Sequence, residues 1–318
     1  MACNIAVVGS FVYDLIVWLP YFPRQGETLL ASEFKMYAGG KGFNQAVTAQ
    51  RCGAQVSMVG KVGADQFGTA FMKLLNQEGI DHRFVIQDET TTTSLGIPMI
   101  NPQGENSIIG VPRANMRLST TEVEAAGQMI AESQVLLLQL EIPLEVTLRA
   151  AQIAHRMGVP VLLNPAPAAY PVEALVPRDE DGRPLVDWLL PNEIEAEMLS
   201  GIKITDPEEA ILAGKAILSK GVQQGVIITL GTRGVIAVTT ENHWYNPAFH
   251  VTPIDPTGAG DAFCGAFAVA LAEGQPIPQA LRFANAAGAL AVTVAGAEPS
   301  LPKRESIESF LNIQQEQE

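Results

Sequence analysis

The chain has 318 residues, of which 47% are hydrophobic, and this composition supplies a buried core and excludes an intrinsically disordered protein. The formal net charge of −14 excludes nucleic-acid binding through a basic surface, because no excess of Lys and Arg exists to neutralise phosphates. Three cysteines and four scattered histidines fit neither a disulfide framework nor a zinc site. The sequence shows no signal peptide and no apolar run long enough to cross a bilayer, so we expect a cytoplasmic protein without membrane contact.

In chain order, the sequence predicts an apolar strand over 5–9, a helix over 45–52, a strand over 56–60 and a helix over 68–78. The alternation continues with strands over 135–140, 159–163, 187–190 and 226–230 and helices over 144–157, 193–199, 207–220, 259–273, 278–294 and 306–314. Apolar strands that alternate with helices are typical of a parallel sheet covered on both faces. We therefore expect one α/β domain over 1–318, with a doubly wound, mostly parallel sheet and helices on both faces.

Two segments, 14–37 and 92–109, break this alternation. Both alternate polar and apolar residues, and the second contains the turn sequence Asn101-Pro102-Gln103-Gly104. Such segments are typical of antiparallel strands with one exposed face. We expect them to pair into a small antiparallel sheet, formed from about 12–38 and 92–113. That sheet is either a lid over the ends of the main strands or a fixed pair of surface hairpins.

A glycine-rich turn with an acid opens the predicted helix over 259–273. The run Pro256-Thr257-Gly258-Ala259-Gly260-Asp261 places small residues at a helix N-terminus, where consecutive backbone N–H groups can face one anion. Asp261 can accept a proton from an attacking hydroxyl. An anion cradle beside a carboxylate meets the needs of phosphoryl transfer, and the alternative is a plain glycine loop whose acid is favoured by the helix dipole.

The two common phosphate-binding motifs are absent. The first strand is followed by Gly9-Ser10-Phe11-Val12 and not by the Gly-x-Gly-x-x-Gly of dinucleotide folds. Lys41 is followed by Gly42, whereas a Walker loop needs Ser or Thr there. The turn over 258–260 is therefore the remaining candidate for phosphate binding.

Four sequence blocks resemble, in order and spacing, those of the ribokinase-like carbohydrate kinases of the phosphofructokinase-B type. The blocks are 38–46 (AGGKGFNQA), 191–197 (PNEIEAE), 229–234 (TLGTRG) and 255–261 (DPTGAGD). The resemblance implies transfer of the γ-phosphate of ATP to a hydroxyl of a small sugar, ribose being the first choice, with Mg²⁺ and K⁺ as cofactors. It also implies that the small sheet is a lid and that two lids contact each other in a homodimer.

The resemblance further implies roles for individual residues. The catalytic group would comprise Asp261 with Gly258, Ala259 and Gly260. Sugar hydroxyls would contact Asp14, Gly40, Lys41, Gly42, Asn44 and Glu141. The nucleotide would contact Asn192, Thr229, Gly231, Gly234, Gly260 and Asn285. Glu195 would bind Mg²⁺ through water, and K⁺ would be surrounded by Asp255, Thr257, Ala291, Val294, Gly296 and Ser300.

Plain structural alternatives exist for several of these residues. Asp14 and Glu141 would then be exposed loop acids, Lys41 a solvated lysine, and Asn192 a helix cap.

Two residues bear on the substrate. Ribokinases carry an asparagine two residues before the aspartate of the first motif, whereas Val12 stands two residues before Asp14. A sugar hydroxyl buried against Val12 would lack a partner, at a cost of roughly 1–3 kcal/mol. Arg113 is either a ligand for a phosphate or carboxylate or a solvated residue. Another pentose or hexose, a sugar phosphate or a nucleoside therefore stays open as substrate, and a non-catalytic sugar or nucleotide sensor stays open as another class of protein.

Overall fold

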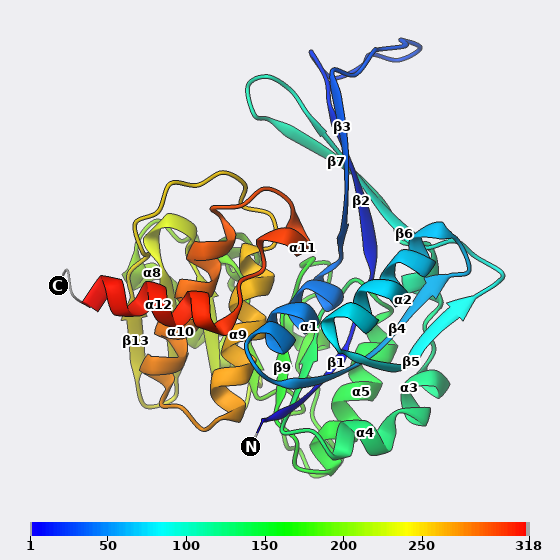
Figure 1. The fold of residues 1–318 in the computed structure, drawn as a ribbon. Coiled ribbons are helices and arrows are strands. Elements are labelled where there is room, and N and C mark those ends of the chain that lie inside the picture. Colours follow the sequence, from blue (N-terminus) through cyan, green and yellow to red (C-terminus); the bar gives the residue numbers. More distant parts are fainter. Residues whose placement is uncertain (1, 316–318) are drawn as a thin grey trace.

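The main sheet of the computed structural model, which describes residues 2–315, contains nine strands in the order β13-β12-β11-β10-β9-β8-β1-β4-β5 (Figure 1). They are β1 (Asn4–Val8), β4 (Gln55–Gly63), β5 (Asp81–Asp88), β8 (Val135–Leu138), β9 (Val161–Leu163), β10 (Trp188–Leu189), β11 (Gly225–Thr229), β12 (Val235–Thr239) and β13 (His243–Asn246). Neighbouring strands from β5 to β11 run parallel, and β12 and β13 extend the sheet antiparallel. The predicted mostly parallel sheet is confirmed.

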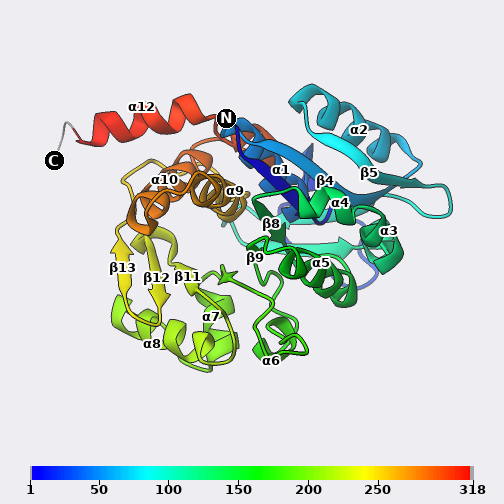
Figure 2. The same cartoon turned by 90° about the horizontal axis from the view of Figure 1, so that it is seen from below.

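Helices cover both faces of this sheet (Figure 2). One layer holds α1 (Lys41–Arg51), α2 (Gln66–Glu78), α9 (Ala259–Ala272), α10 (Ile277–Ala291) and α12 (Arg304–Gln315). The other holds α3 (Thr120–Ala125), α4 (Gly127–Ala131), α5 (Leu144–Arg156), α6 (Val172–Leu175), α7 (Glu193–Ser200) and α8 (Pro207–Leu218). Ile5 and Val7 of β1 pack in the first core, and Ala6 and Val8 pack in the second, because successive side chains of a strand point to opposite faces. No helix within residues 2–315 is long and apolar enough to cross a membrane.

A second sheet projects from the main body and has the strand order β3-β2-β6-β7 (Figure 1). Its strands are β2 (Val12–Trp18), β3 (Glu33–Gly39), β6 (Ser94–Ile100) and β7 (Asn106–Val111). The two predicted insertions therefore do pair in space, each as an antiparallel hairpin. The pairing of β2 with β6 is parallel, which the sequence did not indicate. The reason is that β2 continues from β1 and β6 from β5, and these two strands of the main sheet run in the same direction.

Candidate active site

The turn over 258–260 opens α9 as predicted. Gly258 is the N-cap residue with φ 82°, a left-handed backbone that favours glycine. Gly260 is exposed, and nothing lies within 4 Å of the place where a Cβ would stand. The N–H groups in the first turn of a helix have no partner within the helix. This end of α9 therefore offers donors and open space to an anion.

Asp261 lies in the first turn of α9 and is 8% exposed. Its carboxylate accepts hydrogen bonds from two side chains of α1. Asn44 Nδ2 donates to Oδ2 at 2.9 Å, and Gln45 Nε2 donates to Oδ1 at 3.1 Å. Burial raises the pKa of Asp261 above its ordinary value, although the charge of Lys41 and the two amide donors oppose this. A carboxylate with a raised pKa is a better proton acceptor.

Lys41 begins α1 and places a positive charge among acidic side chains. Burial alone would lower the pKa of its ammonium, but Asp261, Glu141 and Glu195 outweigh that effect and raise the pKa. Lys41 and Asp261 line one cavity of about 490 Å³ together with Gly258, Gly260, Asn192 and Glu195. The predicted catalytic turn and the predicted block at 191–197 therefore face one space.

A second cavity of about 380 Å³ adjoins the first, because Thr229, Gly231, Pro256 and Gly260 line both. Most of its remaining wall is apolar and includes Phe249, Val251, Phe263 and Val292. Gly234 and Asn285 also line it, and Asn285 Nδ2 donates to Asn246 Oδ1 and to the carbonyl of Pro247, both at 2.8 Å. All the residues predicted for the nucleotide therefore surround these two joined cavities.

Glu141 follows β8 and ties the loop before α1 to the loop after β1. Its Oε2 accepts from Ser10 Oγ at 2.6 Å and from the backbone N–H of Lys41 at 3.0 Å. A Cβ at Gly42 would lie 2.3 Å from the backbone N of Ser10, and one at Gly40 would lie 2.5 Å from that of Val12. Only glycine allows the two backbones to approach this closely.

Asp14 on β2 lies between two glycines. A Cβ at Gly96 would stand 2.2 Å from Asp14 Oδ1, and one at Gly39 would stand 2.8 Å from Oδ2. Among the described residues, none donates a hydrogen bond to this carboxylate. Burial, with smaller contributions from Glu141 and Asp261, raises the pKa of Asp14 to about 7. Asp14 lines neither of the two cavities, but its carboxylate is influenced by Glu141 and Asp261 and is available to accept hydrogen bonds from a ligand.

Asn192 and Glu195 form a capping box at the start of α7. Asn192 Oδ1 accepts from the N–H of Glu195 at 2.8 Å, and Glu195 Oε2 accepts from the N–H of Asn192 at 2.9 Å. Asn192 therefore does cap α7, which is the structural role considered as the alternative to ligand binding. Each contact uses one side-chain oxygen, so Asn192 Nδ2 and Glu195 Oε1 stay available beside the first cavity.

Asp255 joins two of the segments predicted to surround a monovalent cation. Its Oδ1 accepts from the N–H of Thr257 and its Oδ2 from the N–H of Gly296, both at 2.9 Å. Burial alone would raise the pKa of Asp255, but these hydrogen bonds lower it on balance. Ala291 is buried at the end of α10, and Val294 is 42% exposed. Ser300 is buried, and its Oγ donates to the carbonyl of Ala297 at 2.7 Å.

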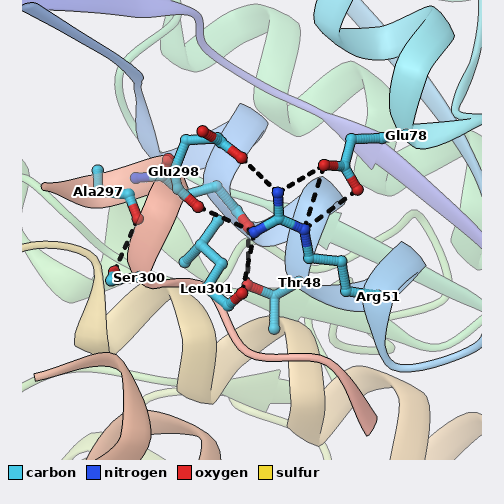
Figure 3. A network of polar contacts seen from close by, with 8 residues as sticks. Thr48, Arg51, Glu78, Ala297, Glu298, Ser300 and Leu301 are labelled. Atoms are coloured by element: carbon cyan, nitrogen blue, oxygen red, sulfur yellow. Dashed lines mark hydrogen bonds and ion pairs between the residues drawn. The ribbon is translucent and has the colours of Figure 1, made fainter. Parts of the chain in front are cut away.

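Arg51, the last residue of α1, connects this helix to the segment over 297–301 through hydrogen bonds and ion pairs (Figure 3). Its Nη1 donates to the carbonyls of Glu298 and Leu301, both at 2.9 Å. Its Nε donates to the two carboxylate oxygens of Glu78 at 3.2 and 3.1 Å, and its Nη2 pairs with the carboxylates of Glu78 and Glu298. This cluster holds α11 (Ala297–Ser300) in place, and Ala297 in turn packs near Gly258.

Other polar residues of the site were not predicted. Gln45 and Ser10 contact Asp261 and Glu141 directly, and Asn164, which follows β9, lines the first cavity. Gln45 adjoins Asn44 in the block over 38–46, and this position in the sequence could have indicated that Gln45 belongs to the site. Arg113 is exposed at the start of a 3₁₀ turn, and nothing links its side chain to either cavity.

Val12 and Asp14 share one face of β2. A Cβ at Gly96 would lie 3.4 Å from Val12 Cγ1 as well as 2.2 Å from Asp14 Oδ1, so the two side chains lie side by side. The apolar side chain that the sequence placed near Asp14 therefore does lie beside it in the structure.

An anion cradle, a buried carboxylate and a half-buried lysine beside two joined cavities are typical of a small-molecule phosphotransferase. The family model for pfkB family carbohydrate kinases matches residues 3–304. The chain therefore belongs to the pfkB family of carbohydrate kinases, as the four sequence blocks predicted.

Individual relatives agree in sequence and in fold. The chain is 38% identical to a ribokinase of Haemophilus influenzae and 34% identical to a deoxyribokinase of Salmonella typhi, each time over 98% of this chain and 99% of the relative. The structure of Arabidopsis thaliana ribokinase complexed with ribose and ATP superposes with a TM-score of 0.88 at 32% identity, covering 98% of this chain and 99% of that one.

Proposed function

We propose that this carbohydrate kinase transfers the γ-phosphate of ATP to a hydroxyl of ribose. The observation that carries the proposal is the position of Asp261, a buried carboxylate at the N-terminus of α9, beside the junction of the two cavities. The ribokinase relatives and the ribose and ATP complex of the Arabidopsis enzyme support the choice of substrates.

In the proposed reaction, Asp261 accepts the proton of the attacking hydroxyl. The N–H groups of the turn over 258–260 and the ammonium of Lys41 stabilise negative charge on the transferring group. Asp14 and Glu141 accept hydrogen bonds from sugar hydroxyls. Asn44 Oδ1 is buried and has no hydrogen-bond partner among the described residues, so it suits a further hydroxyl donor. The apolar second cavity suits a nucleobase, with Thr229, Gly231, Gly234 and Asn285 around it.

Mg²⁺ and K⁺ fit the residues that are present. Mg²⁺ bound through water needs few protein ligands, and Glu195 keeps one carboxylate oxygen beside the first cavity. K⁺ would be held mainly by backbone carbonyls around Asp255, whose lowered pKa keeps it anionic. When bound, the two ions would add positive charge near the transferring phosphate.

A 2-deoxy sugar is a second candidate, because Val12 presents an isopropyl group beside Asp14 and deoxyribokinases are among the relatives. We expect Val12→Asn to raise kcat/KM for ribose by roughly tenfold, which corresponds to one added hydrogen bond of about 1.4 kcal/mol. Ribose and 2-deoxyribose are compared as substrates of both proteins. Efficient ribose use by the unmodified protein, with no gain in the variant, would show that Val12 does not limit ribose binding.

A coupled assay of ADP release, run over a panel of pentoses, hexoses, sugar phosphates and nucleosides, tests the proposed function. Ribose should give the highest kcat/KM, with 2-deoxyribose next. A preference for a sugar phosphate or for a nucleoside would replace the proposed substrate.

Binding of the sugar should depend on pH through Asp14. Burial raises the pKa of the Asp14 carboxyl to about 7. Asp14 is therefore protonated below that pH and ionised above it. Only the ionised form accepts hydrogen bonds at both oxygens, so KM for the sugar should fall as pH rises through about 7. Asp14→Asn should have a higher KM that no longer changes over this range. A KM that rises with pH in the unmodified protein would contradict this role.

The rate should be higher in K⁺ than in Na⁺ at the same ionic strength, because a fitting ion would order the loops that Asp255 joins. Asp255→Ala should abolish the difference between the two salts. Equal rates in both salts for the unmodified protein would show that K⁺ does not activate the enzyme.

The second sheet supports a homodimer formed through the lid. Phe34, Met36, Ile108 and Ile109 on β3 and β7 are each at least 50% exposed, and apolar side chains on open-edged strands are commonly covered by a partner. Sedimentation at micromolar concentration tests this proposal, and a fully active monomer would count against it.

A further inference from the structure

Gln45 is a fully buried amide behind the reactive carboxylate. Its side chain lies on α1 and contacts polar groups from three other parts of the fold. Nε2 donates to Asp261 Oδ1 at 3.1 Å and to Asn164 Oδ1 at 3.3 Å, and Oε1 accepts from Gln139 Nε2 at 2.6 Å. Gln45 is fully buried and both ends of its amide already have partners, so any effect on the reaction passes through Asp261.

The orientation of the Gln45 amide is fixed from two sides. An ionised Asp261 can only accept, so the NH₂ group of Gln45 must face it. Asn164 imposes the same orientation, because its Nδ2 donates to the carbonyl of Leu190 at 2.8 Å and its Oδ1 must therefore accept. The backbone carbonyl of Leu190 thus sets the direction of a chain of amides that ends at Asp261.

Gln139 shows what this fixed direction requires. Because Gln45 Oε1 faces it, Gln139 must donate through Nε2 and turn its own Oε1 away. That oxygen is buried without a hydrogen-bond partner among the described residues, and a Cβ at Gly9 would lie 2.1 Å from it. Leaving a buried acceptor unpaired is costly. Gln139 therefore has the orientation that Gln45 imposes on it, although this leaves its own oxygen unpaired among the described residues.

Asn44 also holds Asp261, but it differs from Gln45 in one respect. Its Oδ1 is unpaired and suits a substrate hydroxyl, so a change at Asn44 would alter sugar binding and the carboxylate together. The two side chains hold one oxygen each, and together they leave the Asp261 carboxylate a single orientation.

We propose that Gln45, whose amide is oriented by Asn164, is the positioning residue that fixes the Asp261 carboxylate for proton transfer. This inference rests on the proposed function, since it assumes that Asp261 is the base. A misplacement of a reacting group by about 1 Å can cost about 100-fold in rate. Loss of Gln45 should therefore lower kcat and leave KM for ribose and for ATP unchanged.

The test is a double-mutant cycle on kcat with Gln45→Met and Asp261→Asn. Met has a similar length and volume but can neither donate to Asp261 nor accept as an amide. We expect Gln45→Met alone to lower kcat by about 10- to 100-fold, and to have almost no further effect when Asp261 is already Asn, because the two residues act as a unit. An equal loss in both backgrounds would overturn the proposal, as would a raised KM with unchanged kcat.

Two further variants keep the test decisive. Thr48→Val is the matched control, since Thr48 is buried one turn later on α1 and, within residues 2–315, its Oγ1 donates only to the carbonyl of Asn44. It should keep kcat. If Gln45→Met does not fold, Gln45→Leu replaces it in the cycle, because Leu also lacks the amide that donates to Asp261. A normal kcat in Gln45→Leu would then overturn the proposal. An inactive unmodified protein, or full activity of Asp261→Asn, would instead overturn the proposed function.

Discussion

Asp261→Asn is expected to lower turnover by at least about 100-fold, the usual contribution of a positioned general base. The amide has the same shape as the carboxylate but cannot accept the proton of an attacking hydroxyl. Asp261 sits in the wall of the first cavity, and Gly258 and Gly260 leave its helix terminus open to an anion. The substitution leaves the backbone of that terminus unchanged, so ATP should bind as tightly as before.

Steady-state kinetics and calorimetric titration with ATP check both halves of this expectation. Turnover near that of the unmodified protein would remove Asp261 as the base. A loss of ATP affinity as large as the loss of turnover would show that the side chain holds the nucleotide.

Arg51→Met is expected to lower the free energy of unfolding by about 2–4 kcal/mol, because removing one partner of a mostly buried ion pair leaves the others without compensation. The Arg51 side chain is 14% exposed and satisfies two carboxylates and two backbone carbonyls. Loss of the guanidinium would leave Glu78 and Glu298 close together without a shared cation. Chemical denaturation of both proteins measures the difference.

Arg83→Met is the matched control. Arg83 also pairs with an acid, Asp81, but its side chain is 75% exposed, so the surrounding water screens the pair. This variant should unfold at nearly the same denaturant concentration as the unmodified protein. Equal losses in the two variants would show that the Arg51 cluster contributes no more than a surface ion pair.

The fold was predictable where a strand or helix has a clear apolar pattern. β1 and α5 were found almost to the residue, since one is apolar throughout and the other has a buried stripe. The strands β5, β12 and β13 were missed. β5 and β13 mix polar and aromatic residues and are partly exposed, whereas β12 is the exception, since it is apolar and buried. The parallel pairing of β2 with β6 depends on how two distant insertions leave the main sheet, which no local pattern encodes.

The candidate site was predictable where several functional residues share one short block. Lys41 and Asn44 come from one glycine-rich block and Asp261 from another, and the structure brings these blocks together. Gln139 and Asn164 each follow a separate strand as single amides, so only the meeting of strand ends in space shows that they belong to the site. An asparagine at position 192 fits both a helix cap and a ligand contact. The block over 191–197 alone therefore could not tell these two roles apart.

We propose above all that the γ-phosphate of ATP is transferred to a sugar hydroxyl with Asp261 as the base. Direct detection of the products by phosphorus NMR, with ATP, Mg²⁺ and ribose, tests it most directly. We expect one sugar monophosphate and ADP in equal amounts from the unmodified protein, and formation of both at least about 100-fold more slowly from Asp261→Asn. ADP with free phosphate and no sugar phosphate, or no turnover with any sugar in spite of binding, would contradict it, and the second result would indicate a sensor built on a kinase fold.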